Sequence, residues 1–110
     1  MLFYDYRDSF VVHQKTYYMK KFLIERTVPG AGNMTVDELQ ALSKTSNAVI
    51  SVLGKPYRWL ESFVIQDKIY CIHEAEHEEV IREHANCGSF PVDRIDEVKA
   101  VIGPETGRAL

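Results

Sequence analysis

Residues 57–74 read YRWLESFVIQDKIYCIHE, and this stretch decides the fold because it contains two β-strands and the turn between them. Both runs, 57–66 and 69–74, are rich in aromatic and β-branched residues, which favour strands. The polar residues at 66–68 form a short turn, so we expect an antiparallel hairpin. Because side chains of a regular strand alternate between its faces, the first strand should present two groups: Trp59, Glu61, Phe63 and Ile65 on one face, and Arg58, Leu60, Ser62 and Val64 on the other.

The segment before the hairpin predicts a strand followed by a helix. Residues 22–28 are apolar and β-branched, and the Pro and Gly residues that follow end this strand. Thr35 and Glu38 have the spacing of a capping box, so the helix should begin there. Its apolar residues recur near a 3.6-residue period as far as Leu53, and Gly54 provides a C-cap.

The segment after the hairpin predicts a second helix and a last strand. The helix should span Ala75 to Asn86, with acidic residues at its positive N-terminal end. Its inner stripe should consist of Val80, Ile81, His84 and Ala85, with Cys87 as a further candidate. We expect the last strand at Asp96 to Ile102, with three core residues: Val98, Val101 and Ile102.

The resulting order, β-α-β-β-α-β, predicts an α+β ferredoxin-like sandwich with two helices on one face of a four-stranded antiparallel sheet. This domain should span 19–103. We expect the Tyr-rich extension at 1–18 to be poorly ordered or to pack at an edge, and 104–110 to form a polar tail. The second sheet face would be bare, with Trp59 and Phe63 as candidates for it, so the topology favours an α/β barrel-like homodimer.

The composition of the 110-residue chain argues against several classes of protein. The net charge is -3 and Lys and Arg do not cluster, so nucleic-acid binding is not expected. No apolar run approaches the roughly 20 residues of a membrane span, and no signal peptide is recognisable. The two cysteines, Cys71 and Cys87, are too few for a disulfide scaffold, and we interpret both as free thiols. We therefore expect a cytoplasmic protein without membrane contact.

Potential metal ligands gather between positions 71 and 84. The candidates offer thiolate, imidazole and carboxylate groups, which suit nickel, zinc, copper or iron: Cys71, His73, Glu74, His77 and His84. Cys71 and His73 share one side of a strand, and His77 and His84 share a helical face if the helix covers both. No tight ligand signature is present, so structural interpretations stay open: a buried thiol for Cys71, solvated rings for His73 and His77, and a buried, hydrogen-bonded ring for His84.

Glu25 is a further candidate ligand because it lies within an apolar strand. If Glu25 shares a partly buried face with Leu23, its carboxylate needs a cation, a metal or a proton. A pocket between the sheet and the first helix could be lined by Asn47, Trp59 and Ser62. Trp59 is more simply explained as a core or dimer-interface residue. No nucleotide-binding motif or catalytic triad is recognisable, so the catalytic residues of an enzyme are not identified.

Eight short segments, in this order and spacing, resemble a known family: FLIER (22–26), PG (29–30), SNAV (46–49), RWLESFV (58–64), YCIHEA (70–75), IREHA (81–85), GSFP (88–91) and IDEV (95–98). It is a family of small bacterial ferredoxin-like proteins, catalogued as a domain of unknown function, with a nickel-binding dimer as a characterised member. The resemblance covers Lys20 to Ile102. It implies a ferredoxin-like dimer and a nickel role, and it favours Glu25 and His84 as site residues.

Three functional hypotheses follow. The first is a cytoplasmic homodimer that binds nickel or another divalent transition metal for storage, buffering or sensing, with Glu25, Cys71 and His84 as ligands and His73 and His77 as secondary candidates. The second is a small dimeric enzyme of the monooxygenase, isomerase or dehydratase type, with a small molecule bound between sheet and helices. The third is an interaction module in which all histidines are structural or solvated.

Overall fold

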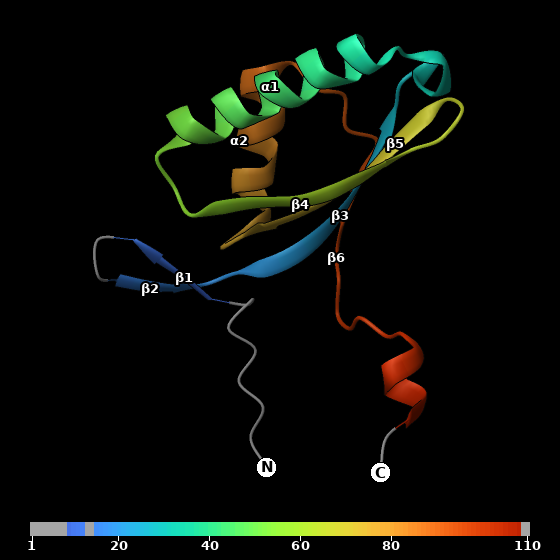
Figure 1. The fold of residues 1–110 in the computed structure, drawn as a ribbon. Coiled ribbons are helices and arrows are strands. Elements are labelled where there is room, and N and C mark those ends of the chain that lie inside the picture. The colour runs from blue at the N-terminus through green and yellow to red at the C-terminus, as the bar shows by residue number, and fades with distance from the viewer. Residues whose placement is uncertain (1–8, 13–14, 109–110) are drawn as a thin grey trace.

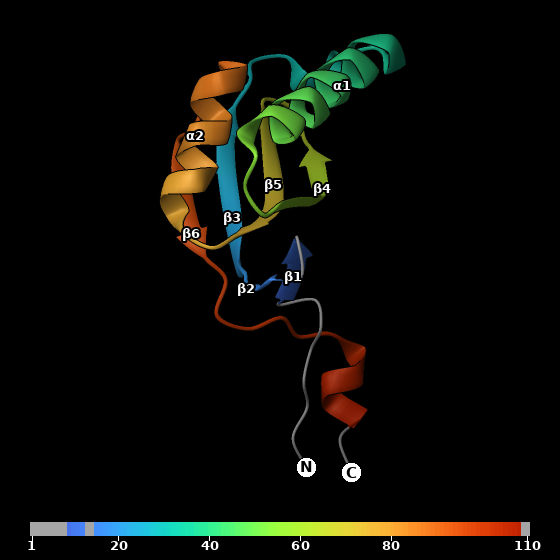
Figure 2. The same ribbon diagram turned by 90° about the vertical axis from the view of Figure 1, so that its left-hand side faces the viewer.

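The predicted element order is confirmed in a computed structural model, which describes residues 9–12 and 15–108 of the chain. The domain contains β3 (Lys20–Thr27), α1 (Val36–Leu53), β4 (Tyr57–Val64), β5 (Lys68–Ala75), α2 (Glu78–Gly88) and β6 (Arg94–Glu97). The strands pair antiparallel in the order β4-β5-β3-β6, and both helices cover the same face of the sheet (Figures 1 and 2). This is the α+β ferredoxin-like arrangement expected from the sequence.

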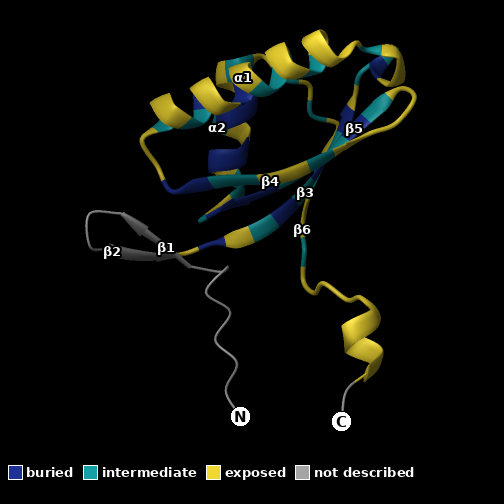
Figure 3. Ribbon diagram, viewed as in Figure 1, coloured by how far each residue is buried: buried dark blue, intermediate teal, exposed yellow. Residues whose placement is uncertain are grey.

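The core lies between the two central strands and the helices. On this inner face Ile24 pairs with Cys71 and Ile95, and Phe22 pairs with His73. The central strands and the inward side of α2 are buried, whereas the outer surface of α1 is exposed (Figure 3). Because inward positions of β3 and β5 alternate with outward ones, every second residue of these strands reaches the space beneath the helices.

The first helix begins and ends where its capping signals predict. The Thr35 side chain accepts a hydrogen bond from the Glu38 backbone N–H at 3.1 Å, and Glu38 Oε1 accepts one from the Thr35 N–H at 2.9 Å. Gly54 ends the helix with a φ of 64°, a conformation that disfavours side chains with a Cβ. The second helix begins later than expected, at Glu78 with His77 as N-cap, because β5 continues to Ala75.

β4 contains a β-bulge, so the expected assignment of its side chains to the two sheet faces is wrong beyond Trp59. Trp59 lies opposite His73, but Glu61 lies opposite Ile72, so Leu60 is the extra residue between them. The bulge reverses the alternation after Trp59. Trp59 therefore faces the helices together with Ser62 and Val64 rather than the bare face, whereas Phe63 and Glu61 face away from the helices.

The prediction for the last strand is also corrected. β6 spans only Arg94–Glu97, and Ile95 is the residue that packs against the core. Val101 and Ile102 are 67% and 80% exposed, and Val98 is only partly buried. The apolar residues at 98, 101 and 102 lack the two-residue alternation of a half-buried strand, so they do not form its inner row.

The two terminal segments contain further short elements. The expectation of a poorly ordered arm concerns 1–18, of which 1–8 and 13–14 lie outside the described residues. Ser9–Val12 (β1) and Lys15–Tyr18 (β2) pair as an antiparallel hairpin separate from the main sheet. Two 3-10 turns, η2 (Ala31–Asn33) and η3 (Pro104–Arg108), follow β3 and β6, and η3 lies away from the sheet (Figure 1). In the part of the chain that the structure describes, no helix is long and apolar enough to cross a membrane.

Candidate functional site

A cavity of about 710 Å³ lies between the inner face of the sheet and the two helices. Its floor is formed by side chains of β3, β4 and β5, and its roof by α1, α2 and the loop that follows α2. The walls are mainly apolar, with a smaller set of polar side chains among them. This size and composition are typical of sites that bind small molecules.

Two histidines meet on the wall of this cavity. His73 comes from the inner face of β5 and His84 from the inner stripe of α2, and each is 1% exposed. Their rings lie edge to face with centroids 5.1 Å apart. Tyr57 contacts both, because it stacks on His84 at 5.0 Å and its hydroxyl hydrogen-bonds His73 Nδ1 at 2.5 Å. An aromatic cluster therefore holds both imidazoles in place.

Burial keeps both rings unprotonated at neutral pH. Desolvation, together with the positive charges of His84 and Arg26, lowers the pKa of His73 to about 3. Desolvation and Arg26 lower the pKa of His84 to about 4. Burial also raises the pKa of Tyr57 well above its usual value, so its phenol stays protonated. Both imidazoles are therefore in the state that metal ligands and hydrogen-bond acceptors require.

One nitrogen of His84 has no partner among the described residues. Its Nε2 hydrogen-bonds the hydroxyl of Ser46, which lies on the buried side of α1, at 3.1 Å. Its Nδ1 is buried and makes no hydrogen bond. Unsatisfied buried polar atoms are rare in native proteins, and each one calls for an explanation such as a catalytic role or a bound water or ion. His84 therefore has one buried nitrogen without a hydrogen-bond partner, on a ring that lines the cavity.

A second polar group surrounds the thiol of Cys71. Ser62 Oγ donates to Cys71 Sγ at 3.0 Å, and Arg26 Nε donates to the same sulfur at 3.4 Å. Trp59 Nε1 donates in turn to Ser62 Oγ at 2.9 Å. All these side chains line the cavity beside the histidines. The free thiol is therefore buried and oriented by two donors.

The loop after α2 completes the roof. Phe90 stacks on His84 with ring centroids 5.1 Å apart, and the Arg26 guanidinium lies 5.5 Å from the Phe90 centroid. Any Cβ at Gly88 would lie 2.2 Å from the Phe90 ring, so only glycine permits this packing. Ser89 has a left-handed φ of 54°, which turns the chain sharply at the end of the helix.

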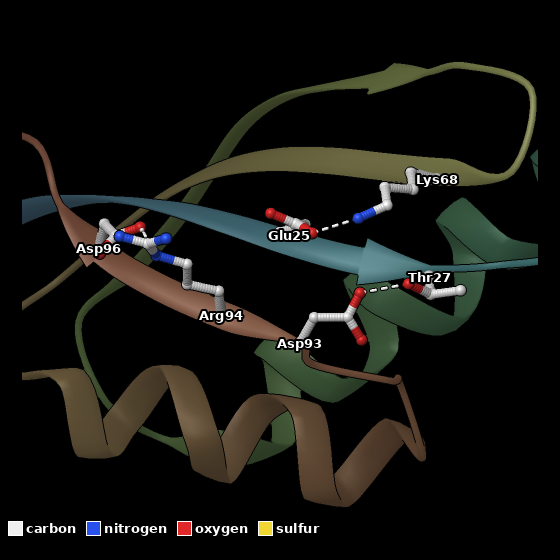
Figure 4. A network of polar contacts seen from close by, with 6 residues as sticks. All are labelled: Glu25, Thr27, Lys68, Asp93, Arg94 and Asp96. Carbon is white, nitrogen blue, oxygen red and sulfur yellow. Dashed lines mark hydrogen bonds and ion pairs between the residues drawn. The ribbon is translucent and has the colours of Figure 1, made fainter.

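Glu25 faces away from this cavity. It pairs in register with Tyr70 and Arg94 on the outer face of the sheet, and its carboxylate forms an ion pair with Lys68 (Figure 4). The same face carries an ion pair between Arg94 and Asp96 at 2.7 Å and a hydrogen bond from Thr27 to Asp93 (Figure 4). Glu25 therefore has the cation that a partly buried carboxylate needs, and it does not meet His84.

The other predicted site residues divide into two groups. Cys71, His73, His84, Trp59 and Ser62 all line the cavity. Asn47 and His77 are exposed and do not line it. Asn47 lies one position beyond Ser46, which is buried and lines the cavity. Among the described residues, no group of three or more His, Cys, Asp or Glu side chains is arranged to hold a metal ion.

Arg26, Ser46, Tyr57 and Phe90 are the site residues that the sequence reasoning missed. A signal for Arg26 was present, because strand alternation places it on the same face as the apolar Phe22 and Ile24. A cation on a core-facing strand position is unusual enough to indicate a site. No comparable sequence signal exists for Phe90, whose position depends on the turn after α2.

Comparisons with known proteins agree with this fold. The family model described as "Nickel responsive protein SCO4226-like" matches residues 22–98. The crystal structure of SCO4226 from Streptomyces coelicolor A3(2) is similar, with a TM-score of 0.64 and 19% sequence identity over 74% of this chain and 99% of that chain. At this identity, the likeness shows the fold alone. A search of curated proteins finds no match. Because the family model covers well over half of the sequence, the chain belongs to the SCO4226-like family of nickel responsive proteins.

Proposed function

We propose that this protein binds a transition-metal ion, specifically nickel, and acts in nickel storage, buffering or sensing. The observation that supports the proposal is the contact between two buried, neutral imidazoles, His73 and His84, on the wall of one cavity. The family description, which names nickel responsiveness, supports the same metal. Neutral imidazole is a ligand that suits nickel and its neighbours in the transition series.

The chemistry of the two rings fits a metal, and the described part of one chain supplies part of a coordination sphere. In each ring one nitrogen is hydrogen-bonded to a hydroxyl, of Tyr57 for His73 and of Ser46 for His84. If that nitrogen carries the proton, the other nitrogen keeps a lone pair for the metal, as in many metal-ligating histidines. No third ligand joins them among the described residues. Water, a small-molecule ligand or a second copy of the chain would fill the remaining positions.

The positive charge of Arg26 affects how a metal ion could bind in the cavity. Its guanidinium disfavours positive charge on both rings, which is one reason for their low pKa values. A bound metal ion would experience the same repulsion. We therefore propose that an anion accompanies the metal in the cavity, since an anion beside Arg26 would offset this repulsion.

Calorimetric titration of the metal-free protein with Ni(II) tests this function. The proposal predicts saturable binding with a defined ratio, weakened at least tenfold in His84→Ala. The matched control is His77→Ala, which removes an exposed imidazole outside the cavity and should bind nickel as the parent does. Equal binding by the parent and His84→Ala would reject His84 as a ligand, and absence of saturable binding would reject the function.

Dimerisation and cellular location belong to the same proposal. The sheet face opposite the helices carries Phe63, which is 50% exposed, and the partly buried Tyr70 and Ile72. Packing of two such faces would cover these side chains. Both cysteines are free, which is typical of a reducing compartment such as the cytoplasm.

The cavity itself favours a second candidate function, the binding or conversion of a small organic molecule. A volume of about 710 Å³ is larger than a bare metal ion needs and falls within the range of organic ligand sites. The neutral His84, with its free Nδ1, could accept a proton or a hydrogen bond from such a molecule. This candidate predicts that organic ligands bind without added metal.

A further inference from the structure

Arg26 is a buried cation, and no described residue places a carboxylate beside it. It is 5% exposed, and the ion pairs among the described residues do not include it. Its Nη1 donates to the backbone oxygen of Pro91 at 2.8 Å, and its Nε donates to Cys71 Sγ at 3.4 Å. These contacts orient the guanidinium but supply no carboxylate or other formally negative oxygen. A buried charge of this kind is costly unless an opposite charge reaches it.

The described residues of the cavity wall include no carboxylate that could neutralise this charge. Asp, Glu and Lys are all missing among them, so Arg26 is the one described lining residue with a permanent formal charge. The two histidines are neutral at pH 7 for the reasons given above. The interior is therefore electropositive, and its low dielectric strengthens the attraction for an anion.

The remainder of the cavity suits an apolar body. Its wall includes the side chains of Met34, Leu39, Leu42, Val64 and Ile69, with the aromatic rings of Trp59 and Phe90. Val64 is 40% exposed, so this wall reaches the protein surface. Burial of hydrocarbon or aryl groups against such a wall is favourable in proportion to the area removed from water.

We infer that the cavity binds a small, largely apolar organic acid, with its carboxylate against the Arg26 guanidinium and its hydrocarbon or aryl part along the apolar wall. The planar guanidinium matches the geometry of a carboxylate. A single cation balances one negative charge, which favours a monocarboxylate over a phosphate dianion. The free Nδ1 of His84 offers a second polar contact for a hydroxyl or carbonyl group on the same molecule. This inference rests on the second candidate function and is independent of nickel binding.

An internal counter-ion is the competing explanation. A Cys71 thiolate, 3.4 Å from Arg26 Nε, would neutralise the guanidinium without any ligand. In that case the cavity would have no preference for an acid over a neutral molecule of the same shape. Replacement of Cys71 by Ser would then expose the charge and create such a preference.

The experiment compares octanoate with octanamide, a neutral molecule of nearly the same shape, on the full-length, metal-free protein. Trp59 is the only tryptophan of the chain and lines the cavity, so its fluorescence reports binding directly. We expect saturable binding of octanoate and at least tenfold weaker binding of octanamide. Equal affinities, or no saturable signal from octanoate, would overturn the inference. If octanamide binds as tightly as octanoate, the cavity is still a small-molecule site. Failure of this inference can therefore be distinguished from failure of the second candidate function.

Three variants test whether Arg26 provides the charge that causes the preference for octanoate. Arg26→Met should lose the preference for octanoate, whereas Arg94→Met, which removes an exposed arginine on the outer face, should keep it. Cys71→Ser should also keep it, and a preference that appears only in Cys71→Ser would overturn the inference. If Arg26→Met does not fold, the comparison of the two ligands on the parent protein still decides, because that comparison needs no variant.

Discussion

The two histidines of the cavity link protein stability to pH. An unfolded histidine titrates near 6.5, whereas burial lowers the pKa of His84 to about 4 and that of His73 to about 3. Between these values the unfolded chain binds more protons than the folded one, so stability falls as the pH drops. Above about pH 7 neither ring is protonated in either state, and their contribution is constant.

We therefore predict an acid-sensitive fold. Below pH 6.5, each histidine should cost about 1.4 kcal/mol per pH unit until its folded pKa is reached. Urea unfolding at pH 7.5, 6.0 and 5.0 measures this loss. His84→Gln removes one titrating ring and should show a smaller loss, whereas His77→Ala, at an exposed position, should behave as the parent does. The same pH slope in His84→Gln and the parent would contradict the assignment.

The contribution of the Tyr57 hydroxyl to stability can be measured separately from that of its ring. Tyr57→Phe keeps the ring stacked on His84 but leaves Nδ1 of the buried His73 without its hydrogen bond. The expected loss of unfolding free energy is about 1–3 kcal/mol. Tyr18→Phe removes a hydroxyl from a residue that is 69% exposed and should be neutral within about 0.5 kcal/mol. An equally small effect of Tyr57→Phe would show that the bond contributes nothing to stability.

Several cavity residues could be predicted from the sequence, but which of them lie together could not. Cys71 and His73 reach one wall because they are two apart on a strand, and His84 reaches it because it belongs to the inner stripe of α2. Glu25 and Arg26 show the limit, since adjacent strand residues face opposite sides. Which side holds the cavity depends on where the helices pack, so the sequence favoured Glu25 as a candidate, whereas Arg26 is the residue of the pair that lines the cavity.

Among the secondary-structure elements, α1 is the one whose boundaries local chemistry defines best. Its capping box and its left-handed glycine satisfy backbone groups that a helix end leaves unpaired. Ser43 and Ser46, which lie between these ends, line the cavity. The position of the helix therefore matters for the site as well as for the fold.

Thr35→Ala should destabilise the protein by about 1 kcal/mol, because it removes the side-chain acceptor of the capping box. Ser51→Ala replaces an exposed residue inside the same helix and should be neutral or slightly stabilising, since alanine favours helices. Thermal and urea unfolding of both variants provide the comparison. A loss in Ser51→Ala as large as that in Thr35→Ala would argue against a specific capping effect.

The elements that sequence reasoning misplaced depend on tertiary contacts. The bulge in β4 inserts Leu60 between Trp59 and Glu61, and no simple alternation rule marks the extra residue. The last strand pairs only with residues 22–25 of β3, so its length is decided by that partner rather than by its own apolar content. β5 extends to Ala75 because it pairs there with Lys20 and Tyr57, which delays the start of α2.

For the molecule as a whole, the ferredoxin-like sandwich leaves one sheet face without helices (Figure 2). We predict that the protein is a dimer in solution, with a mass of about 25 kDa, twice the chain mass of 12.7 kDa. Light scattering coupled to size-exclusion chromatography measures this mass. Phe63→Glu should shift the protein toward the monomer because it places a charge on the outer face, whereas Val36→Glu, at an exposed position of α1, should not. A monomeric parent at all accessible concentrations would contradict the prediction.

We propose that nickel binds in the sheet–helix cavity, with His84 as a ligand. Diffraction data from crystals grown with Ni(II), collected on both sides of the nickel absorption edge, test it most directly. We predict anomalous density inside the cavity, at a bonding distance of about 2 Å from Nδ1 of His84, which has no hydrogen-bond partner among the described residues. Nickel density confined to the protein surface, for example at the exposed His77, with none in the cavity, would contradict it.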